Sequence, residues 1–354
     1  MLATFVTAAG LCQGAALLAQ NGTAQSQTPQ QDPYKFHTGV ELINVTATVT
    51  DQSGRFVRGL TQNDFRVFDD GRPQPISHFS AERVPVSIGI ALDTSGSMEG
   101  EKIEAARSAL DRFLTQLLDP EDEVFLYKFD NQPTLVEGWT HDKQRISDAV
   151  RRLRPHGGTA LYDAVADAVQ MAEQGRNQKK AVLIISDGND TSSRTDVIAL
   201  QQLIRQTEVL VYAIGIDAGA NVERDPPGGW IQQAQYPPRP PGRFPMPFPF
   251  PRPGRPGGPR PYPGRGSMGD ERVNGSALRA ITDDSGGRTE IVRSARDLDP
   301  ATADIADELS RQYYIGYVAP NGRDGKWHEI RVEVGNGSYL VRARRGYVAS
   351  NASQ

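Results

Sequence analysis

The chain contains 354 residues and carries a formal net charge of −4 at neutral pH. This acidic balance excludes the nucleic-acid-binding proteins whose affinity depends on clustered cations. The length exceeds the usual size of one domain, about 100 to 200 residues, so we expect two folded units joined by linkers.

The N-terminal segment has the composition of an export signal. Residues 2–19 hold no charged side chain, and the residues that follow are rich in Gln, Thr and Ser. We therefore expect a signal peptide over residues 1–24 and a disordered linker over residues 25–36. Two alternatives stay open at this point, lipid attachment at Cys12 and a single membrane anchor.

Both flanks of the folded region show the alternation that is typical of half-buried strands. Residues 37–82 contain such a pattern at 43–50, followed by Asp-Gly turns, and residues 313–348 contain another at 330–334. After a Gly-Asn-Gly turn the chain returns along residues 339–343. Neither flank has enough strands for a stable sandwich, so we expect the two to form one small antiparallel β-domain. The alternative is two separate β pieces.

Residues 83–312 alternate between apolar runs of strand length and amphipathic helical patterns. A last helix is expected at residues 300–311. The alternation predicts an α/β fold with a doubly wound, Rossmann-like parallel sheet, inserted between the two halves of the β-domain. The expected strands of this sheet are residues 84–92, 123–129, 181–186, 208–216 and 288–292.

Residues 225–271 interrupt the inserted domain with a stretch dominated by Pro, Gly and Arg. Proline at such density disfavours both helix and sheet, so we expect a disordered surface insertion. Two other interpretations stay open. The segment could dock a proline-binding or acidic partner, or it could fold over the neighbouring strand ends as a lid.

Carboxylates and hydroxyls follow two of the predicted strands and precede predicted helices. Because ligands of doubly wound sheets bind beyond the carboxyl ends of the strands, these side chains are expected at one edge. Oxygen ligands suit Mg²⁺, Mn²⁺ or Ca²⁺ rather than zinc or copper. The alternative is that they only cap helices and turns. The five residues are Asp93, Ser95, Ser97, Thr159 and Asp187.

The order Asp-x-Ser-x-Ser, then Thr, then Asp resembles the metal-ion-dependent adhesion site of the von Willebrand factor type A domain family. The resemblance implies that Ser95, Ser97 and Thr159 bind the ion directly, whereas Asp93 and Asp187 act through bound waters. Mg²⁺ is the expected ion, with Mn²⁺ or Ca²⁺ as alternatives. An Asp or Glu carboxylate of a protein ligand would complete the coordination. The rim around the ion would consist of His156, Gly158, Asn189 and Asp190.

The flanking sequences GLTQNDFRVFDDG, at residues 59–71, and QYYIGYVAPNGRDGKWHEIRVEV, at residues 312–334, resemble secreted bacterial members of the same family. We therefore expect a secreted, periplasmic or cell-envelope protein. Its expected function is metal-dependent binding of a protein partner, as an adhesion or interaction module.

Two other functions stay open, an assembly or scaffold factor for an envelope complex and a metal-assisted hydrolase. Catalysis is not expected, because no Gly-x-Ser-x-Gly elbow accompanies the serines. The five histidines also lack the spacing that is typical of metal ligands. No nucleic-acid partner is expected, and contact with a membrane is expected only through the N-terminal signal or anchor.

Overall fold

The computed structural model describes residues 41–217, 274–320, 324–335 and 337–350. These residues belong to one compact unit, Gly39–Gln354. The predicted signal peptide, the linker at residues 25–36 and the Pro/Gly/Arg-rich insertion at residues 225–271 lie outside the described residues. Within the described part of the chain, no helix has the length and apolar character that crossing a bilayer requires.

The centre of the fold is a six-stranded sheet in the order β10-β9-β8-β5-β6-β7. The five predicted strands are all present and pair in parallel. All eight residues of β5 are buried, as the continuous apolar run predicts for a strand covered on both faces. The strands are β5 (Val86–Asp93), β6 (Glu123–Phe129), β7 (Pro133–Thr140), β8 (Lys179–Ser186), β9 (Leu210–Ile216) and β10 (Thr289–Val292).

The sequence patterns do not predict strand β7. It pairs antiparallel with β6 at one edge of the sheet, so the sheet is mixed rather than wholly parallel. Its residues are half-buried or exposed, and Leu135 on it is 45% exposed. An edge strand that buries so little apolar surface leaves no continuous apolar run to recognise.

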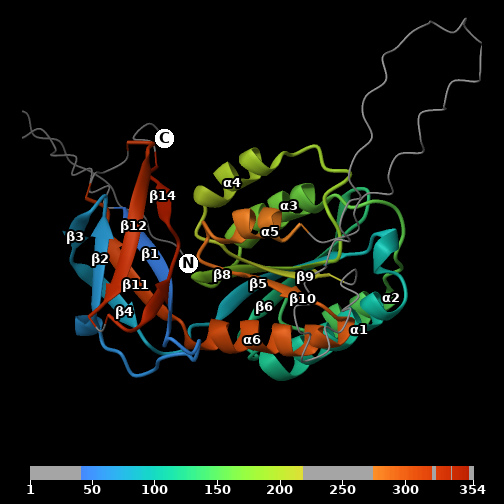
Figure 1. The fold of residues 1–354 in the computed structure, drawn as a ribbon, viewed down its shortest axis with the longest axis horizontal. Coiled ribbons are helices and arrows are strands. Elements are labelled where there is room, and N and C mark those ends of the chain that lie inside the picture. The colour runs from blue at the N-terminus through green and yellow to red at the C-terminus, as the bar shows by residue number, and fades with distance from the viewer. Residues whose placement is uncertain (1–40, 218–273, 321–323, 336, 351–354) are drawn as a thin grey trace, which may run out of the picture. The chain divides into compact units, whose positions relative to one another are not determined.

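Helices cover both faces of the sheet, which confirms the doubly wound prediction (Figure 1). One core cluster joins one face to α1, α2 and α6, and a second joins the other face to α3, α4 and α5. A π-helical turn, Phe113–Leu117, extends α1. The helices are α1 (Glu101–Arg112), α2 (Lys143–Arg152), α3 (Leu161–Glu173), α4 (Val197–Arg205), α5 (Gly275–Thr282) and α6 (Leu298–Arg311).

Strands from both flanks build one β-domain of two four-stranded antiparallel sheets, as predicted. Their orders are β13-β1-β11-β4 and β14-β12-β2-β3, so each sheet mixes N-terminal and C-terminal strands. A shared apolar core joins the two sheets, which rules out two separate β pieces. The strands are β1 (Leu42–Thr50), β2 (Phe65–Asp69), β3 (Arg72–Gln74), β4 (Ile76–Ser80), β11 (Tyr313–Val318), β12 (Trp327–Val334), β13 (Leu340–Arg342) and β14 (Gly346–Val348).

The return of the chain after β12 differs from a simple hairpin. Strand β13 pairs with β1, with Val341 opposite Val49, and therefore belongs to the other sheet. Strand β12 is already flanked by β2 and β14. Because both edges of β12 are taken, the returning strand satisfies its backbone groups at the edge of the second sheet.

A buried carboxylate links α6 to the β-domain. Glu308 is 1% exposed and accepts hydrogen bonds from Tyr212 of β9 at 2.9 Å and from Thr48 of β1 at 3.1 Å. It also pairs with Arg288 at 3.0 Å and with Arg342 of β13. One side chain thus joins the central sheet, its last helix and both flanks of the chain.

Candidate metal centre

The predicted oxygen ligands meet at one edge of the central sheet. Strands β5 and β8 are parallel neighbours, with Leu92 opposite Ile185, so the chain leaves both at the same end. Asp93 ends β5, and Asp187 directly follows β8. The topology therefore places both carboxylates at the carboxyl ends of adjacent strands.

Hydroxyl oxygens lie within contact distance of one another and of Asp187. Ser95 Oγ is 3.0 Å from Ser97 Oγ, and Ser97 Oγ donates to Asp187 Oδ1 at 2.8 Å. A Cβ atom placed on Gly188 would lie 3.5 Å from Thr159 Oγ1 and 3.9 Å from Ser97 Oγ. The structure thus gathers the two serines, Thr159 and Asp187 around Gly188. We call these four residues, together with Asp93, the oxygen cluster.

Asp93 lies behind the hydroxyls and positions them. Its carboxylate is fully buried, where Oδ1 accepts from the Ser95 amide at 2.8 Å and Oδ2 accepts from Ser186 Oγ at 2.5 Å. Burial raises the pKa of Asp93 to about 6, although the bonds from Ser186 and Ser95 act in the opposite direction. A nearby cation would offset that burial cost. The bond from Ser186 joins the end of β8 to the end of β5, and the bond from the Ser95 amide fixes the turn that follows β5.

Backbone hydrogen bonds explain why glycines precede Thr159. The Gly96 amide donates to the Gly157 carbonyl at 3.0 Å, which ties the first loop to the second. Gly157 has a φ of 77°, a conformation that favours glycine, and a Cβ atom there would lie 2.6 Å from Asn131 Nδ2. Asn131 in turn accepts from the Gly158 amide at 2.8 Å. The glycines let these loops approach closely enough to bring Thr159 into the oxygen cluster.

Sequence patterns miss Lys102 and Ser186, which both contact predicted ligands. The Lys102 ammonium pairs with Asp187 and donates to the Ser97 carbonyl at 3.1 Å. Its signal in the sequence is weak, because a lysine in the first turn of a helix is ordinarily solvated. Ser186 was easier to predict from the sequence, because a hydroxyl at the end of a buried apolar strand needs a hydrogen-bond partner.

The four predicted rim residues have different surroundings. The His156 side chain is 62% exposed, with Nδ1 3.4 Å from an Asp130 oxygen. Gly158 is half-buried beside Asn131. Asn189 Oδ1 is buried and accepts no hydrogen bond from any described residue.

Asp190 faces helix α3 rather than the oxygen cluster. Its Oδ1 accepts from the Tyr162 amide at 3.2 Å and from the Ser193 hydroxyl. Its side chain therefore braces the first turn of α3, which is the alternative role of a turn and cap residue.

The donor set fits a hard divalent cation. Three hydroxyls and two carboxylates are the oxygen ligands that Mg²⁺, Mn²⁺ and Ca²⁺ prefer. The only imidazole predicted near the oxygen cluster, that of His156, points to Asp130. With Lys102 included, two carboxylates and one ammonium leave a formal charge of −1 for a divalent ion to neutralise.

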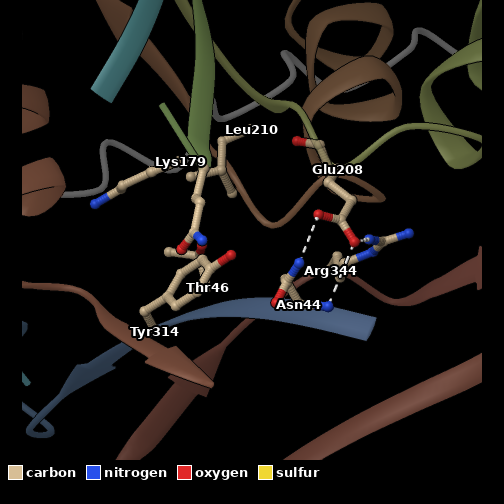
Figure 2. Close-up of a pocket in the computed structure, with 9 residues that line it drawn as sticks. Asn44, Thr46, Lys179, Glu208, Leu210, Tyr314 and Arg344 are labelled. Carbon is tan, nitrogen blue, oxygen red and sulfur yellow. Dashed lines mark hydrogen bonds and ion pairs between the residues drawn. The ribbon is translucent and has the colours of Figure 1, made fainter. Parts of the chain in front are cut away.

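A second polar region lies at the opposite end of the sheet, where β8 and β9 begin. Figure 2 shows this small cavity between Lys179, Glu208 and the β-domain residues Asn44 and Tyr314. Asn44 donates twice to Glu208, at 3.3 Å each, from its amide and its side chain. Asn44 thus occupies the Glu208 carboxylate, and the Lys179 ammonium donates to the Leu309 carbonyl instead.

Comparisons with known proteins identify the central domain. The family model of the von Willebrand factor type A domain matches residues 88–189. Inter-alpha-trypsin inhibitor heavy chain 4 of Mus musculus is 27% identical over 146 residues, which is 37% of this chain and 15% of that protein. An uncharacterized protein of Synechocystis sp. is 26% identical over 137 residues, 38% of this chain and 32% of that protein. The matched region thus spans less than a third of either relative.

Among solved structures, the von Willebrand factor type A protein of Catenulispora acidiphila is 13% identical, with a TM-score of 0.46. That match covers 90% of this chain and 76% of that one. Domains of the matched family generally serve as protein-interaction or adhesion modules. Because the family model spans both strands and all three loops of the oxygen cluster, the central domain of this chain is a von Willebrand factor type A domain.

Proposed function

We propose that this protein is a metal-dependent binding module in which a divalent cation, Mg²⁺ in the first place, recognises an acidic side chain of a protein partner. The observation that carries the proposal is the contact of Ser97 with both Ser95 and Asp187 beside Thr159. Ser95, Ser97 and Thr159 would hold the ion through neutral hydroxyls, and Asp93 and Asp187 would supply the negative charge behind them.

Charge explains why an acidic ligand would be selected. The oxygen cluster has a formal charge of −1 because Lys102 offsets one carboxylate. A divalent cation would reverse this to +1 in a partly buried site, where electrostatic attraction is stronger than in water. A carboxylate from a partner would restore neutrality, whereas a cationic or apolar side chain would not.

The proposal places the protein outside the cytoplasm and assigns it no catalytic role. Export is supported by the uncharged segment at residues 2–19. A binding role is supported by the hydroxyl-rich ligand set, because a hydrolytic metal site uses a metal-bound water that a base can deprotonate. The histidine predicted near the oxygen cluster, His156, lies against Asp130 instead.

The test measures metal binding and partner capture on the full chain. Mg²⁺ and Mn²⁺ are titrated calorimetrically into the wild type, into Ser97→Ala and Thr159→Ala, and into Thr134→Ala as an exposed control on β7. The same proteins are then used to capture partners from envelope extract, with and without a chelator. We expect the two cluster variants to lose metal binding and capture, while the control keeps both.

Two results would overturn the proposal. One is metal binding that is unchanged in both cluster variants. The other is capture of the same partners by the wild type, by the variants and in the presence of chelator. Circular dichroism of each variant verifies that the fold is retained.

A further inference from the structure

A second group of metal-ligating side chains lies in the β-domain, away from the oxygen cluster. Asp69 ends β2, Asp70 forms the turn to β3, and His328 lies on β12. One potential ligand atom from each residue lies within 4.8 Å of the other two. His328 lies 258 positions after Asp70 in the sequence, which is why the spacing of the histidines gives no indication of this group.

Asp69 contributes a buried carboxylate oxygen that lacks a donor. The residue is fully buried, and its Oδ2 accepts from Tyr317 at 2.8 Å and from Tyr347 at 3.0 Å. Its Oδ1 accepts no hydrogen bond from any described residue and lies 3.9 Å from His328 Nδ1. Burying an anionic oxygen without a donor costs free energy that a bound cation would offset.

His328 is oriented as metal-binding histidines are. Its Nε2 lies 3.0 Å from Asp324 Oδ1, and its Nδ1 lies 2.8 Å from Asp70 Oδ2 and points towards Asp69. The ring is only 5% exposed and stacks on Tyr347 at 5.2 Å. A carboxylate that accepts the Nε2 proton leaves the Nδ1 lone pair directed at the other two carboxylates, the arrangement typical of carboxylate–histidine–metal sites.

We propose that Asp69, Asp70 and His328 form a zinc site, with Asp324 as the positioning residue for the imidazole. One imidazole and two carboxylates are ligands that Zn²⁺ accepts, and Mg²⁺ and Ca²⁺ avoid nitrogen. A tetrahedral zinc with bonds of about 2.0 Å places its ligand atoms about 3.3 Å apart. The 2.8 and 3.9 Å separations from Nδ1 lie on either side of that value.

The site would brace one sheet of the β-domain, because its ligands come from β2, from the β2–β3 turn and from the neighbouring strand β12. Asp70 has a φ of 48° and Gly71 a φ of 75°, so the turn that presents the ligands is tight. Through the tyrosine bonds to Asp69, the ion would also be linked to β11 and β14. Asp70 is exposed, which leaves the fourth ligand position open to water. Zinc is therefore expected to stabilise the β-domain rather than to bind the partner of the oxygen cluster.

The rival interpretation is a protonated imidazolium that pairs with the carboxylates and never binds a metal. Zinc binding separates the two, because a metal displaces the Nδ1 proton whereas an ion pair requires it. Calorimetric titration of Zn²⁺ into the full chain, in excess Mg²⁺ to occupy the oxygen cluster, tests the proposal directly. We expect one zinc ion per chain and a rise in the melting temperature.

Variants define the ligands. His328→Gln and Asp69→Asn are expected to abolish zinc binding, and Asp324→Asn to weaken it by about 10- to 100-fold, as loss of an outer carboxylate does. Asp324 lies before β12, outside the helices and strands. The Asp324→Asn variant therefore still tests the zinc site if His328→Gln or Asp69→Asn fails to fold. The matched controls are His78→Gln, an exposed histidine, and Ser97→Ala in the oxygen cluster, both of which should bind zinc as the wild type does.

Three outcomes overturn the proposal. They are the absence of zinc binding by the wild type, zinc binding that survives His328→Gln and Asp324→Asn, and zinc binding that is lost in Ser97→Ala. The last would assign zinc to the oxygen cluster. The proposal does not rest on the function of the oxygen cluster, so either can fail alone.

Discussion

The Lys102 ammonium of α1 pairs with the Asp187 carboxylate after β8, across 85 residues of sequence. The Asp187 side chain is fully buried and that of Lys102 is 24% exposed. The same ammonium donates to the Ser97 carbonyl, so Lys102 contacts two of the three loops that carry predicted ligands. Lys102 therefore supplies a positive charge inside the oxygen cluster, next to the expected position of the metal ion.

Removing this cation should strengthen metal binding. In Lys102→Met the formal charge of the oxygen cluster falls from −1 to −2, so we expect the Mg²⁺ affinity to rise by about tenfold, or about 1.4 kcal/mol. In chelator the variant should melt below the wild type, because Asp187 is then buried without its partner. Calorimetry and thermal melts measure the two effects, with Lys180→Met as the control. An unchanged Mg²⁺ affinity in Lys102→Met would contradict electrostatic repulsion between the Lys102 ammonium and the bound ion.

Glu308 should be the most costly side chain to remove at the junction with the β-domain. Glu308→Ala leaves Arg288 and Arg342 without their buried partner. We expect the free energy of unfolding to fall by about 3 to 5 kcal/mol, measured by denaturant titration. Asp304→Ala, on the exposed side of the same helix, should change it by less than about 0.5 kcal/mol. Equal effects of the two would show that the buried network adds nothing to stability.

Gly287 should tolerate no side chain. A Cβ atom there would overlap the Val211 carbonyl oxygen and lie 2.6 Å from the Val211 carbonyl carbon, and backbone atoms of a central strand cannot move aside. We expect Gly287→Ala to lower the free energy of unfolding by about 3 kcal/mol or more. At Gly138 of β7 no atom lies within 4 Å of the added Cβ, so Gly138→Ala serves as the control. A stable Gly287→Ala protein would contradict this packing.

Lys179 should make stability depend on pH in the alkaline range. Burial lowers the pKa of Lys179 to about 7, an effect that attraction to Glu308 opposes. Between pH 7 and about 10 the unfolded chain binds the proton and the folded chain does not, so stability rises with pH. We expect the unfolding free energy of the wild type to gain about 1.4 kcal/mol per pH unit relative to Lys179→Met. Parallel curves for the two proteins across this range would contradict the shift.

Local patterns in the sequence were sufficient for the five parallel strands of the central sheet. The run that became β5 is buried throughout, and period and length identify such a strand without any knowledge of its neighbours. Asp93 and Asp187 could be placed at one edge because parallel strands end together. Strand β7 escaped prediction because it buries too little apolar surface to show a period.

The sequence by itself determined the alternation of strands and helices, the antiparallel character of both flanks and the residue types of the oxygen cluster, because each depends on neighbours within about ten positions. Only the tertiary structure decided which strands of the two flanks pair, that Lys102 neutralises Asp187, and that Asp69, Asp70 and His328 meet. The physical reason is that these contacts join segments 85 to more than 250 residues apart. Packing of the whole core determines which of these segments meet, and the periodic patterns of the local sequence do not contain that information.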